Sequence, residues 1–338
     1  MSHALHSRGY YHSLNDYFLF TRGSGSSLVL LTVYVDDIIL TGTDLEEISN
    51  LKLFLHDQFK IKDLGLLHYF LGIEVFYSGS GILLHQSKFI HDLLKEYHCD
   101  TSSSLPQPDK YRSLLGKFNF LTHTRPDMSF TVQHLSQFMQ HPCVPHMKAV
   151  IHLCAISGAL LLLVCLCRFI VIVIGPYALI VDGFCVLFGG SLISWKAKNK
   201  PVVSLSLAES EYRSVSKAVG EITWLSHLVS DFWLSSSLPI PVFYDNQSAI
   251  HISKNSVFHE LTKHIELDCH FVRTKFGNGL ISLHHTPSSS ELADIFTKIL
   301  PCAAHHSHLL KLGVLSTSNL RGVLRLLYIE TYKELGQV

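Results

Sequence analysis

Residues 28–42 read LVLLTVYVDDIILTG and place two carboxylates, Asp36 and Asp37, between two apolar runs. The β-branched residues on both sides favour extended backbone, so the stretch predicts a strand, a tight turn and a second strand. Aspartate is common in turns, and a solvated turn is the simplest interpretation of the pair. The apolar flanks favour another, because a tip buried between such strands keeps two charges only when a cation compensates them. Since magnesium prefers carboxylate oxygens, the pair is a candidate metal site.

Composition limits the class of protein. The chain has 338 residues, 47% of them hydrophobic, which allows more than one domain with a sizeable core. Lysine and arginine total 27, as do aspartate and glutamate, so nucleic-acid binding would have to rest on local charge. The eight cysteines lack the spacing of a zinc site or a disulfide scaffold. We expect a reducing compartment, cytoplasmic or nuclear, because the amino terminus also lacks a secretory signal pattern.

Hydrophobic periodicity predicts a mixed chain of helices and strands, α+β in its first half and α/β in its second. A Ser- and Pro-rich linker at 101–109 divides the first half. Before the linker the pattern predicts a helix at 44–59, a strand pair at 66–86 and a helix at 86–98. After it, the pattern predicts two helical segments within 111–139 and alternating strands and helices from 183 to about 300.

Residues 153–181 interrupt this pattern with an apolar run in which Arg168 is the one charged residue. Such a run is long enough to predict a transmembrane helix. A membrane-associated protein anchored at 153–181 is therefore one interpretation of the chain.

The stretch VYVDDIILTG, followed by FKIKDLGLLHYFLGIEV, resembles the palm of copia-type retrotransposon reverse transcriptases. The likeness continues through KYRSLLGKFNFLTHTRPDMSFTVQHLSQFMQHPCVPHMKA. It resumes with GGSLISWKAKNKPVVSLSLAESEYRSV, YDNQSAIHISKNSVFHELTKHIELDCHFVR and ELADIFTKIL, which are similar to the ribonuclease H domain of the same polyprotein. The resemblance covers nearly the whole chain apart from 153–181 and the carboxyl end.

The resemblance implies a partial reverse transcriptase palm followed by a degenerate ribonuclease H-like domain. The implied segments are the end of the palm with its following helix (1–105), connection helices (106–152), an anomalous apolar segment (153–182), a ribonuclease H-like domain lacking its first strand (183–300) and a carboxyl-terminal tail (301–338).

In the palm of this family, three carboxylates hold the two divalent ions that drive nucleotide addition. Asp36 and Asp37 match two of these acids and would be metal ligands. The third acid comes from an earlier strand that has no counterpart here, since Asp16 matches a different position. We therefore expect that this half does not polymerise alone.

In the ribonuclease H domain, four carboxylates hold two magnesium ions that position water for cutting RNA in an RNA–DNA hybrid. Glu211, Asp245 and Asp294 match the second, third and fourth acids and would be catalytic metal ligands. His284, or its neighbour His285, matches a product-releasing histidine.

Each of these three acids also has a purely structural interpretation. Glu211 would favour a helix dipole, Asp245 would cap a helix, and Asp294 would pair with Lys298 four residues on. Their ordered recurrence in matching surroundings favours the catalytic interpretation of all three together.

The first acid of the cage is missing. Between Asp127 and Asp231 the sequence has one aspartate, Asp182, and it lies too late to match. Because magnesium gives up its bound water reluctantly, a site that lacks one of its four carboxylates should bind the two ions weakly.

The chain thus resembles an inactive remnant whose ancestral partners are RNA–DNA hybrid or primer-template nucleic acid and Mg²⁺. Two alternatives to the inactive remnant stay open. One is the membrane anchor, and the other is a residual magnesium-dependent nuclease in which another acid replaces the missing first acid. In the family that the chain resembles, the first acid lies in a YSDADW-like string on the opening strand. We attribute residues 153–181 to compensating frameshifts, because this span replaces the region that should contain that string. Without its opening strand the sheet should expose apolar edges, so we expect the protein to be poorly soluble.

Overall fold

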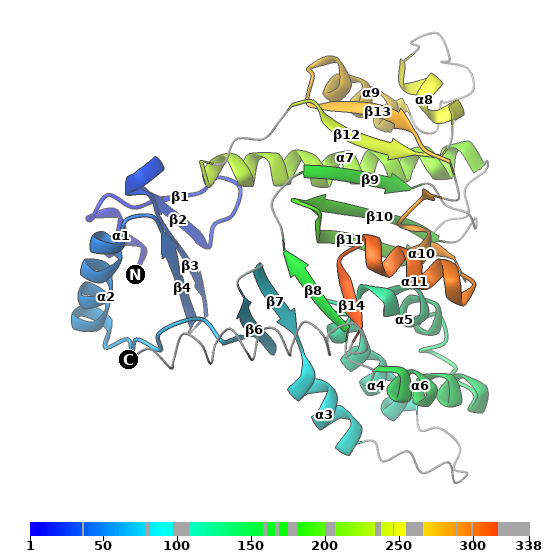
Figure 1. Cartoon of the computed structure of the whole chain (residues 1–338), viewed down its shortest axis with the longest axis horizontal. Helices are drawn as coiled ribbons and strands as arrows, with labels where there is room; N and C mark the ends of the chain where they lie inside the picture. The colour runs from blue at the N-terminus through cyan, green and yellow to red at the C-terminus, as the bar shows by residue number, and fades with distance from the viewer. Residues whose placement is uncertain are drawn as a thin grey trace. The chain divides into compact units, whose positions relative to one another are not determined.

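The computed structural model describes residues 1–35, 37–78, 81–96, 108–157, 161–165, 169–174, 181–199, 207–233, 238–245, 247–254, 266–287, 290–298 and 300–316. The chain divides into two compact units, each with its own core of buried apolar residues. Figure 1 labels their helices and strands. The smaller unit comprises 1–67 with 220–238, and the larger one comprises 68–219 with 239–338. This division differs from the five expected segments, because strands on both sides of the linker share one sheet in the larger unit.

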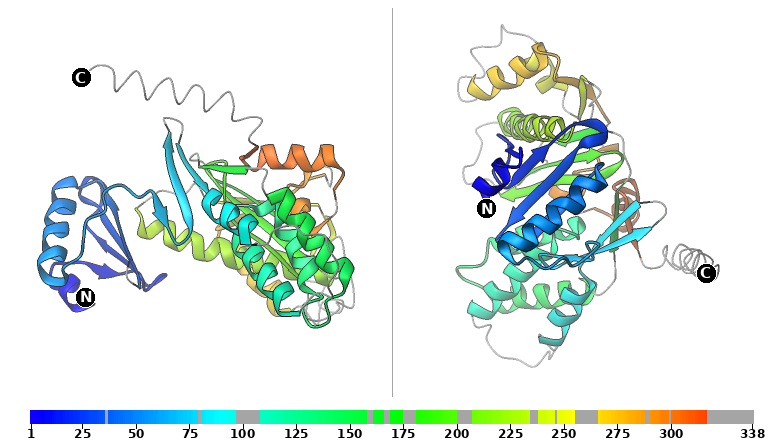
Figure 2. Two further views of the ribbon diagram at one scale, coloured as in Figure 1. Left: turned by 90° about the horizontal axis from the view of Figure 1, so that it is seen from below. Right: turned by 90° about the vertical axis from the view of Figure 1, so that its left-hand side faces the viewer.

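The smaller unit is an antiparallel sheet covered by a helix. The predicted hairpin at 28–42 and the predicted helix at 44–59 are both confirmed. Asp44 caps that helix by accepting a hydrogen bond from the Glu47 amide at 2.9 Å, and Leu51 and Leu55 are buried in the core of the unit. Figure 2 shows the helix lying along the sheet. The elements, with the strands in sheet order, are β1 (Tyr11–His12), β2 (Leu19–Arg22), β3 (Val29–Tyr34) and β4 (Asp37–Gly42), with α1 (Ser2–His6), η1 (Gly25–Ser27) and α2 (Leu45–Phe59).

The larger unit contains an antiparallel sheet that joins distant parts of the sequence. The predicted strand pair around Gly81 is confirmed, and its second strand pairs with a strand from the anomalous segment. A strand near the carboxyl end completes the sheet, so part of the expected tail is ordered structure. The strand order is β14 (Val314–Ser316), β8 (Leu161–Cys165), β7 (Gly81–His85), β6 (Ile73–Ser78) and β5 (Tyr69–Phe70).

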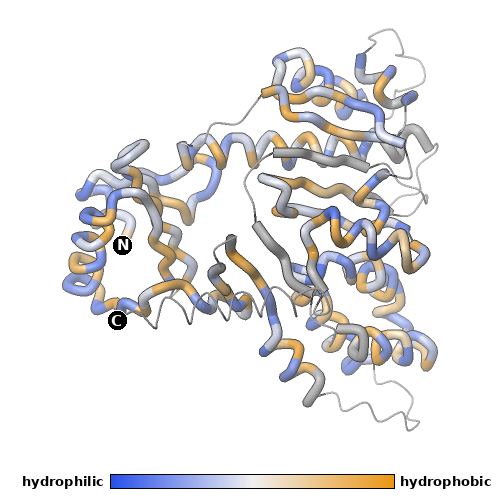
Figure 3. Tube along the Cα trace, in the orientation of Figure 1, coloured by the Kyte–Doolittle hydropathy of each residue, from blue (hydrophilic) through white to orange (hydrophobic). Residues whose placement is uncertain are grey.

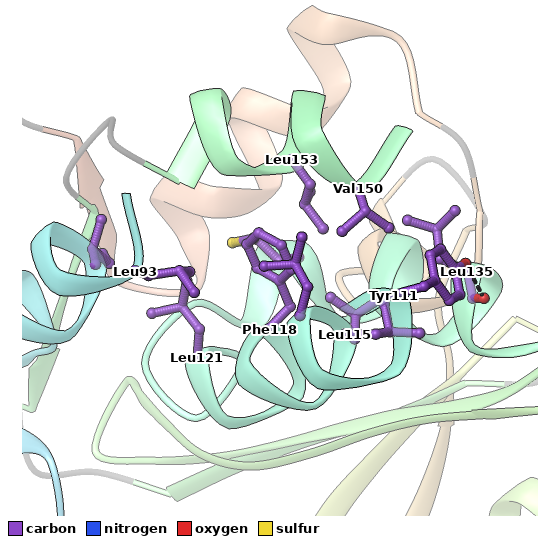
Figure 4. Packing of buried hydrophobic residues seen from close by; sticks show 12 residues of the cluster. Leu93, Tyr111, Leu115, Phe118, Leu121, Leu135, Val150 and Leu153 are labelled. Carbon is purple, nitrogen blue, oxygen red and sulfur yellow. Dashed lines mark hydrogen bonds between the residues drawn. The ribbon is translucent and has the colours of Figure 1, made fainter. Parts of the chain in front are cut away.

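A helical layer follows in the same unit and has its own apolar core (Figure 4). The Tyr111 hydroxyl donates a 2.7 Å hydrogen bond to the carbonyl of Leu135 inside this core. The last helix of the layer, which the sequence pattern did not predict, runs into the anomalous segment at Leu153. The helices are α3 (Ser87–Glu96), α4 (Pro108–Leu121), η2 (Pro126–Met128), α5 (Ser129–Ser136) and α6 (Val144–Ser157).

The second sheet of the larger unit contains the expected α/β elements. Its first three strands are antiparallel, and two further strands run parallel to the central one. The order is β11 (Ser191–Asn199), β10 (Val181–Phe188), β9 (Phe169–Ile174), β12 (Ile240–Tyr244) and β13 (Ile281–His285). The helices that accompany it along the chain are α7 (Leu207–Asp231), α8 (Gln247–Lys254), α9 (Glu266–Gly277), α10 (Asp294–Thr297) and α11 (Cys302–Lys311). The part of α7 from residue 220 onward belongs to the smaller unit. Polar and apolar bands alternate along α7 in the hydropathy view (Figure 3).

Two expectations about the anomalous segment are corrected. The sheet does not lack its central strand, because residues 169–174 form β9 and pair with both β10 and β12. The segment is also not one long helix, since its described parts are the end of α6, two strands and the start of β10. Among the residues that the structure describes, no helix is long and apolar enough to cross a membrane. An apolar, β-branched run suffices for a strand that is flanked on both sides.

Candidate functional site

The acidic pair of the hairpin lies at a strained turn. Tyr34 and Asp37 face each other as the last pair of the β3–β4 ladder, so two residues connect the strands. The first of them, Val35, has φ +50° and is 80% exposed. A β-branched residue adopts this conformation at a cost, which the tight connection imposes. Asp36 lies outside the described residues.

Asp37 is exposed at the first position of β4. The premise that the tip is buried is therefore wrong, and desolvation gives no reason for a cation there. The proposed metal-ligand role of the pair stays a prediction that rests on the family resemblance alone.

A second group of acids gathers in the larger unit, at the carboxyl end of β12 and around α10. Asp245 directly follows β12, and Asp294 is the first residue of α10. The structure adds a third acid, Glu291, which interacts with both of them. Sequence reasoning missed Glu291, although it lies three residues before Asp294 in the same quoted motif.

Glu291 is completely buried. Burial raises the pKa of its carboxyl to about 10, and the neighbouring Asp245 and Asp294 carboxylates contribute in the same direction. Glu291 is therefore protonated at neutral pH. Neither carboxyl oxygen of Glu291 has a well-formed hydrogen bond among the described residues, although its interaction with Asp245 contributes to the raised pKa.

Asp294 is buried beside a cation. The Lys298 ammonium lies 2.6 Å from its Oδ1 in an ion pair, and both side chains are largely buried. Burial raises the pKa of the Asp294 carboxyl, while the hydrogen bond and charge of Lys298 oppose that rise. The structural interpretation of Asp294 as a partner of Lys298 is thus observed directly.

His308 of α11 lies next to this acidic group. Its Nε2 lies 2.8 Å from the Glu291 carbonyl and its Nδ1 lies 2.7 Å from the Ala304 carbonyl. This buried ring therefore ties the chain just before α10 to α11, and its positive form would oppose the rise in the pKa of Asp294.

The other predicted residues do not join this group among the described contacts. The backbone of Glu211 lies in the first turns of α7, but its side chain is outside the described residues. His284 is exposed near the end of β13, where its Nε2 lies 2.9 Å from the Ser282 hydroxyl. Its ring also lies 5.5 Å from that of Phe243. His285 is exposed as well.

The resemblance implies that the opening strand of the ribonuclease H-like sheet carries the first acid, but β9 contains no acidic residue. Val171 and Ile172 of β9 pair with Val242 and Phe243 of β12, so the end of β9 runs beside the strand end that Asp245 follows. The sequence of β9 is FIVIVI. The strand therefore has no acidic residue at any of its positions.

The residues that the structure describes show no divalent metal cage, and the side chain of Glu211 lies outside them. Within the described ranges, no group of three or more His, Cys, Asp or Glu side chains could hold a metal ion. Asp294 is neutralised by Lys298, and Glu291 is neutral through its own proton. In this structure Lys298 and the proton of Glu291 thus compensate the negative charge of the group.

The family of the chain follows from its sequence similarity to known proteins. A family model described as reverse transcriptase (RNA-dependent DNA polymerase) matches residues 1–108. The retrovirus-related Pol polyprotein from transposon RE1 of Arabidopsis thaliana is 32% identical over 336 residues. That alignment covers 90% of this chain and 23% of the polyprotein. The chain therefore spans about a quarter of the length of such relatives.

Two further similar proteins align with different shares of this chain. The uncharacterized mitochondrial protein AtMg00810 of Arabidopsis thaliana is 32% identical over 225 residues, which are 58% of this chain and 94% of that protein. A solved structure of the foamy viral protease-reverse transcriptase in complex with RNA/DNA hybrid has a TM-score of 0.48 at 17% identity. It covers 80% of this chain and 37% of the viral one.

The retrovirus-related Pol polyprotein from transposon RE2 of Arabidopsis thaliana adds 31% identity across 94% of this chain, so the likeness extends well beyond the reverse transcriptase region. The chain belongs to the family of copia-type retrotransposon Pol polyproteins.

Proposed function

We propose that this chain binds RNA–DNA hybrid through a ribonuclease H-like domain that does not cleave it. Residues 1–105 would correspond to the end of the palm, 106–152 to the connection, and 183–300, with β9 added, to the ribonuclease H-like domain. The sheet in which β9, β10 and β11 are antiparallel and β12 and β13 run parallel to β9 supports this assignment.

The proposed loss of cleavage rests on the charges around α10, which compensate one another without a metal ion. Lys298 neutralises Asp294, Glu291 holds a proton, and β9 offers no acid. Two-metal cleavage needs ionised carboxylates that hold both ions, and this arrangement supports neither ion.

The test uses the full chain and a labelled RNA–DNA hybrid, with binding followed by fluorescence anisotropy and cleavage by gel electrophoresis. We expect binding that weakens with salt and no cleavage in Mg²⁺ or Mn²⁺. Metal-dependent cleavage that Glu211→Gln and Asp245→Asn both remove would establish the residual nuclease instead. Absence of hybrid binding at low salt would overturn the proposed function itself.

A further inference from the structure

His146 forms a hydrogen bond at the start of α6. The backbone N–H of Cys143, the residue before the helix, donates to His146 Nδ1 at 3.1 Å. The Cys143 carbonyl accepts the first hydrogen bond of the helix, from the Met147 amide at 3.2 Å. Cys143 is therefore the N-cap residue, and His146 is the third helical residue. This is the position from which a Glu or Gln side chain reaches back to the N-cap amide in a capping box.

The direction of this hydrogen bond determines which protonation state of His146 can form it. A backbone N–H can only donate, so His146 Nδ1 accepts and carries no proton. The neutral imidazole has one such acceptor nitrogen, whereas the imidazolium has two donors and no acceptor. The contact with Cys143 is therefore present only while His146 is neutral.

A second proton on the ring acts against the start of the helix in two ways. It turns Nδ1 into a donor that faces the Cys143 N–H, and it places a positive charge at the positive end of the helix dipole. Met147, in the same first turn, packs against the apolar core in which Val150 and Leu153 of α6 are buried (Figure 4). Loss of the cap should therefore loosen the first turn of α6 and this contact of Met147.

Phe138 holds the imidazole at the helix start. The rings of Phe138 and His146 are stacked, with centroids 3.8 Å apart and planes 19° from parallel. An aromatic face attracts a cation, so this contact works against release of the charged ring. The stack is compatible with both protonation states, whereas the hydrogen bond and the dipole favour only the neutral one. The sign of the pH response therefore depends on which of these effects is larger, and it is measurable.

Other charges that could influence His146 lie on the elements packed against α6. On α4, the Arg112 side chain donates to the Met139 carbonyl at 3.0 Å and pairs with Asp109 at 3.2 Å, so its charge is compensated. In the described part of the chain, no carboxylate forms an ion pair with His146. Exposed titratable side chains of these elements include Lys88, His91 and Asp92 of α3, Lys110 of α4, His134 of α5, His141 of the turn before α6, and Lys148 and His152 of α6.

We propose that neutral His146 caps α6 and that a second ring proton releases the first turn of this helix. The folded state then binds that proton less readily than the unfolded chain does. Stability from the cap is therefore complete above about pH 8 and is lost as the pH falls towards about 5, the range in which histidine side chains change charge. This pH-sensitive cap involves none of the residues around Asp294 and does not depend on the proposed function.

Two variants of the full chain test the cap by urea denaturation between about pH 8 and 5. His146→Gln keeps an acceptor at the capping position but does not titrate, and His146→Ala removes the acceptor at every pH. As the pH falls, the unfolding constant of the wild type should rise several-fold relative to that of His146→Gln. The change should stay below about tenfold per pH unit, the limit for one proton. The deficit of His146→Ala relative to the wild type should shrink over the same range.

The comparison between variants removes the titration of groups that all of them share, including Glu291. His152→Gln, at an exposed position of the same helix, is the matched control. Amide hydrogen exchange provides a local measurement. After correction for the intrinsic pH dependence of exchange, protection of residues 143–148 should fall several-fold at low pH in the wild type and be retained in His146→Gln.

Three results would overturn the proposal. If His146→Ala is as stable as the wild type at pH 8, the ring does not cap the helix. If both differences stay constant from pH 8 to 5, the cap does not respond to pH. If the wild type instead gains stability over His146→Gln as the pH falls, the stack on Phe138 outweighs the hydrogen bond and a proton strengthens the helix start.

Discussion

Glu291 is a buried acid that the folded protein keeps neutral. Its pKa is raised to about 10 from an ordinary value of 4.5, first by burial and then by Asp245. Between these two values the folded state holds a proton that the unfolded state releases. Stability from this group is therefore full below about pH 4.5 and is lost as the pH rises towards 10.

The corresponding prediction concerns Glu291→Gln, which keeps the shape of the protonated side chain without a titrating group. Its free energy of unfolding, relative to the wild type, should rise by about 1.4 kcal/mol per pH unit from pH 5 to 9. Urea denaturation at several pH values measures this difference. Glu266→Gln at an exposed position is the matched control. A constant difference between Glu291→Gln and wild type would mean that Glu291 is ionised in the folded protein.

Val35 supports a second prediction at this scale. Because it has φ +50° and is 80% exposed, Val35→Gly removes backbone strain and little burial. The unfolding free energy should increase by up to about 1 kcal/mol, after the greater flexibility of glycine in the unfolded chain is included. Val33→Gly, within regular β3, should instead lower it. Equal destabilisation by both substitutions in urea titrations would exclude strain at Val35.

The sequence predicted part of the acidic group, and the missing part has a physical reason. Asp245 and Asp294 were found by the resemblance, and Lys298 by its helical spacing. Glu291 was missed because its burial depends on the long-range contacts of β12 and α11, which no local pattern records. The role of Asp37 could not be judged either, since its exposure follows from the turn geometry and not from the apolar flanks.

At the scale of elements, α4 and α5 are joined by one buried hydrogen bond. Tyr111 is fully buried, and its hydroxyl donates to the Leu135 carbonyl at 2.7 Å. Tyr111→Phe should lower the unfolding free energy by about 0.5–1.5 kcal/mol. It removes this hydrogen bond, while the Phe138 amide still donates to the Leu135 carbonyl at 3.1 Å. Tyr11→Phe at an exposed position is the matched control and should change little. Thermal melts of both variants provide the measurement, and indistinguishable melting temperatures would argue against this contact.

The central position of β9 leads to a backbone prediction. Ile172 pairs with β10 on one side and with β12 on the other, so Ile172→Pro should remove ladder bonds and cost about 3 kcal/mol or more. Ile193 lies at an irregularity in the β10–β11 ladder and has no register partner there. Ile193→Pro should therefore be tolerated better, as proline is at bulges. Soluble yield and Tm compare the two variants, and equal tolerance would contradict a central β9.

At the scale of the whole molecule, fold class and the regular elements followed from the sequence, while the sheet partners did not. The hairpin, α2 and the alternating elements after 183 have clear local periods. The joining of β7 to β8 and the insertion of β9 depend on partners that are distant in sequence. Hydropathy alone favoured a membrane helix for 153–181, because an apolar run does not distinguish a buried strand from a helix.

The anomalous segment leads to the last prediction, which concerns the coding DNA. Residues 153–181 contain no acid, yet β9 within them occupies the centre of a sheet. Compensating frameshifts explain both facts, because shifted codons of an acidic motif yield Ile, Leu and Val, and such residues form a buried strand whatever their origin. Translating the DNA across 153–181 in the other two forward frames should recover a string like YSDADW. Unrelated or stop-containing peptides in both frames would exclude frameshifts and leave the apolar strand as the sequence that this gene has always encoded.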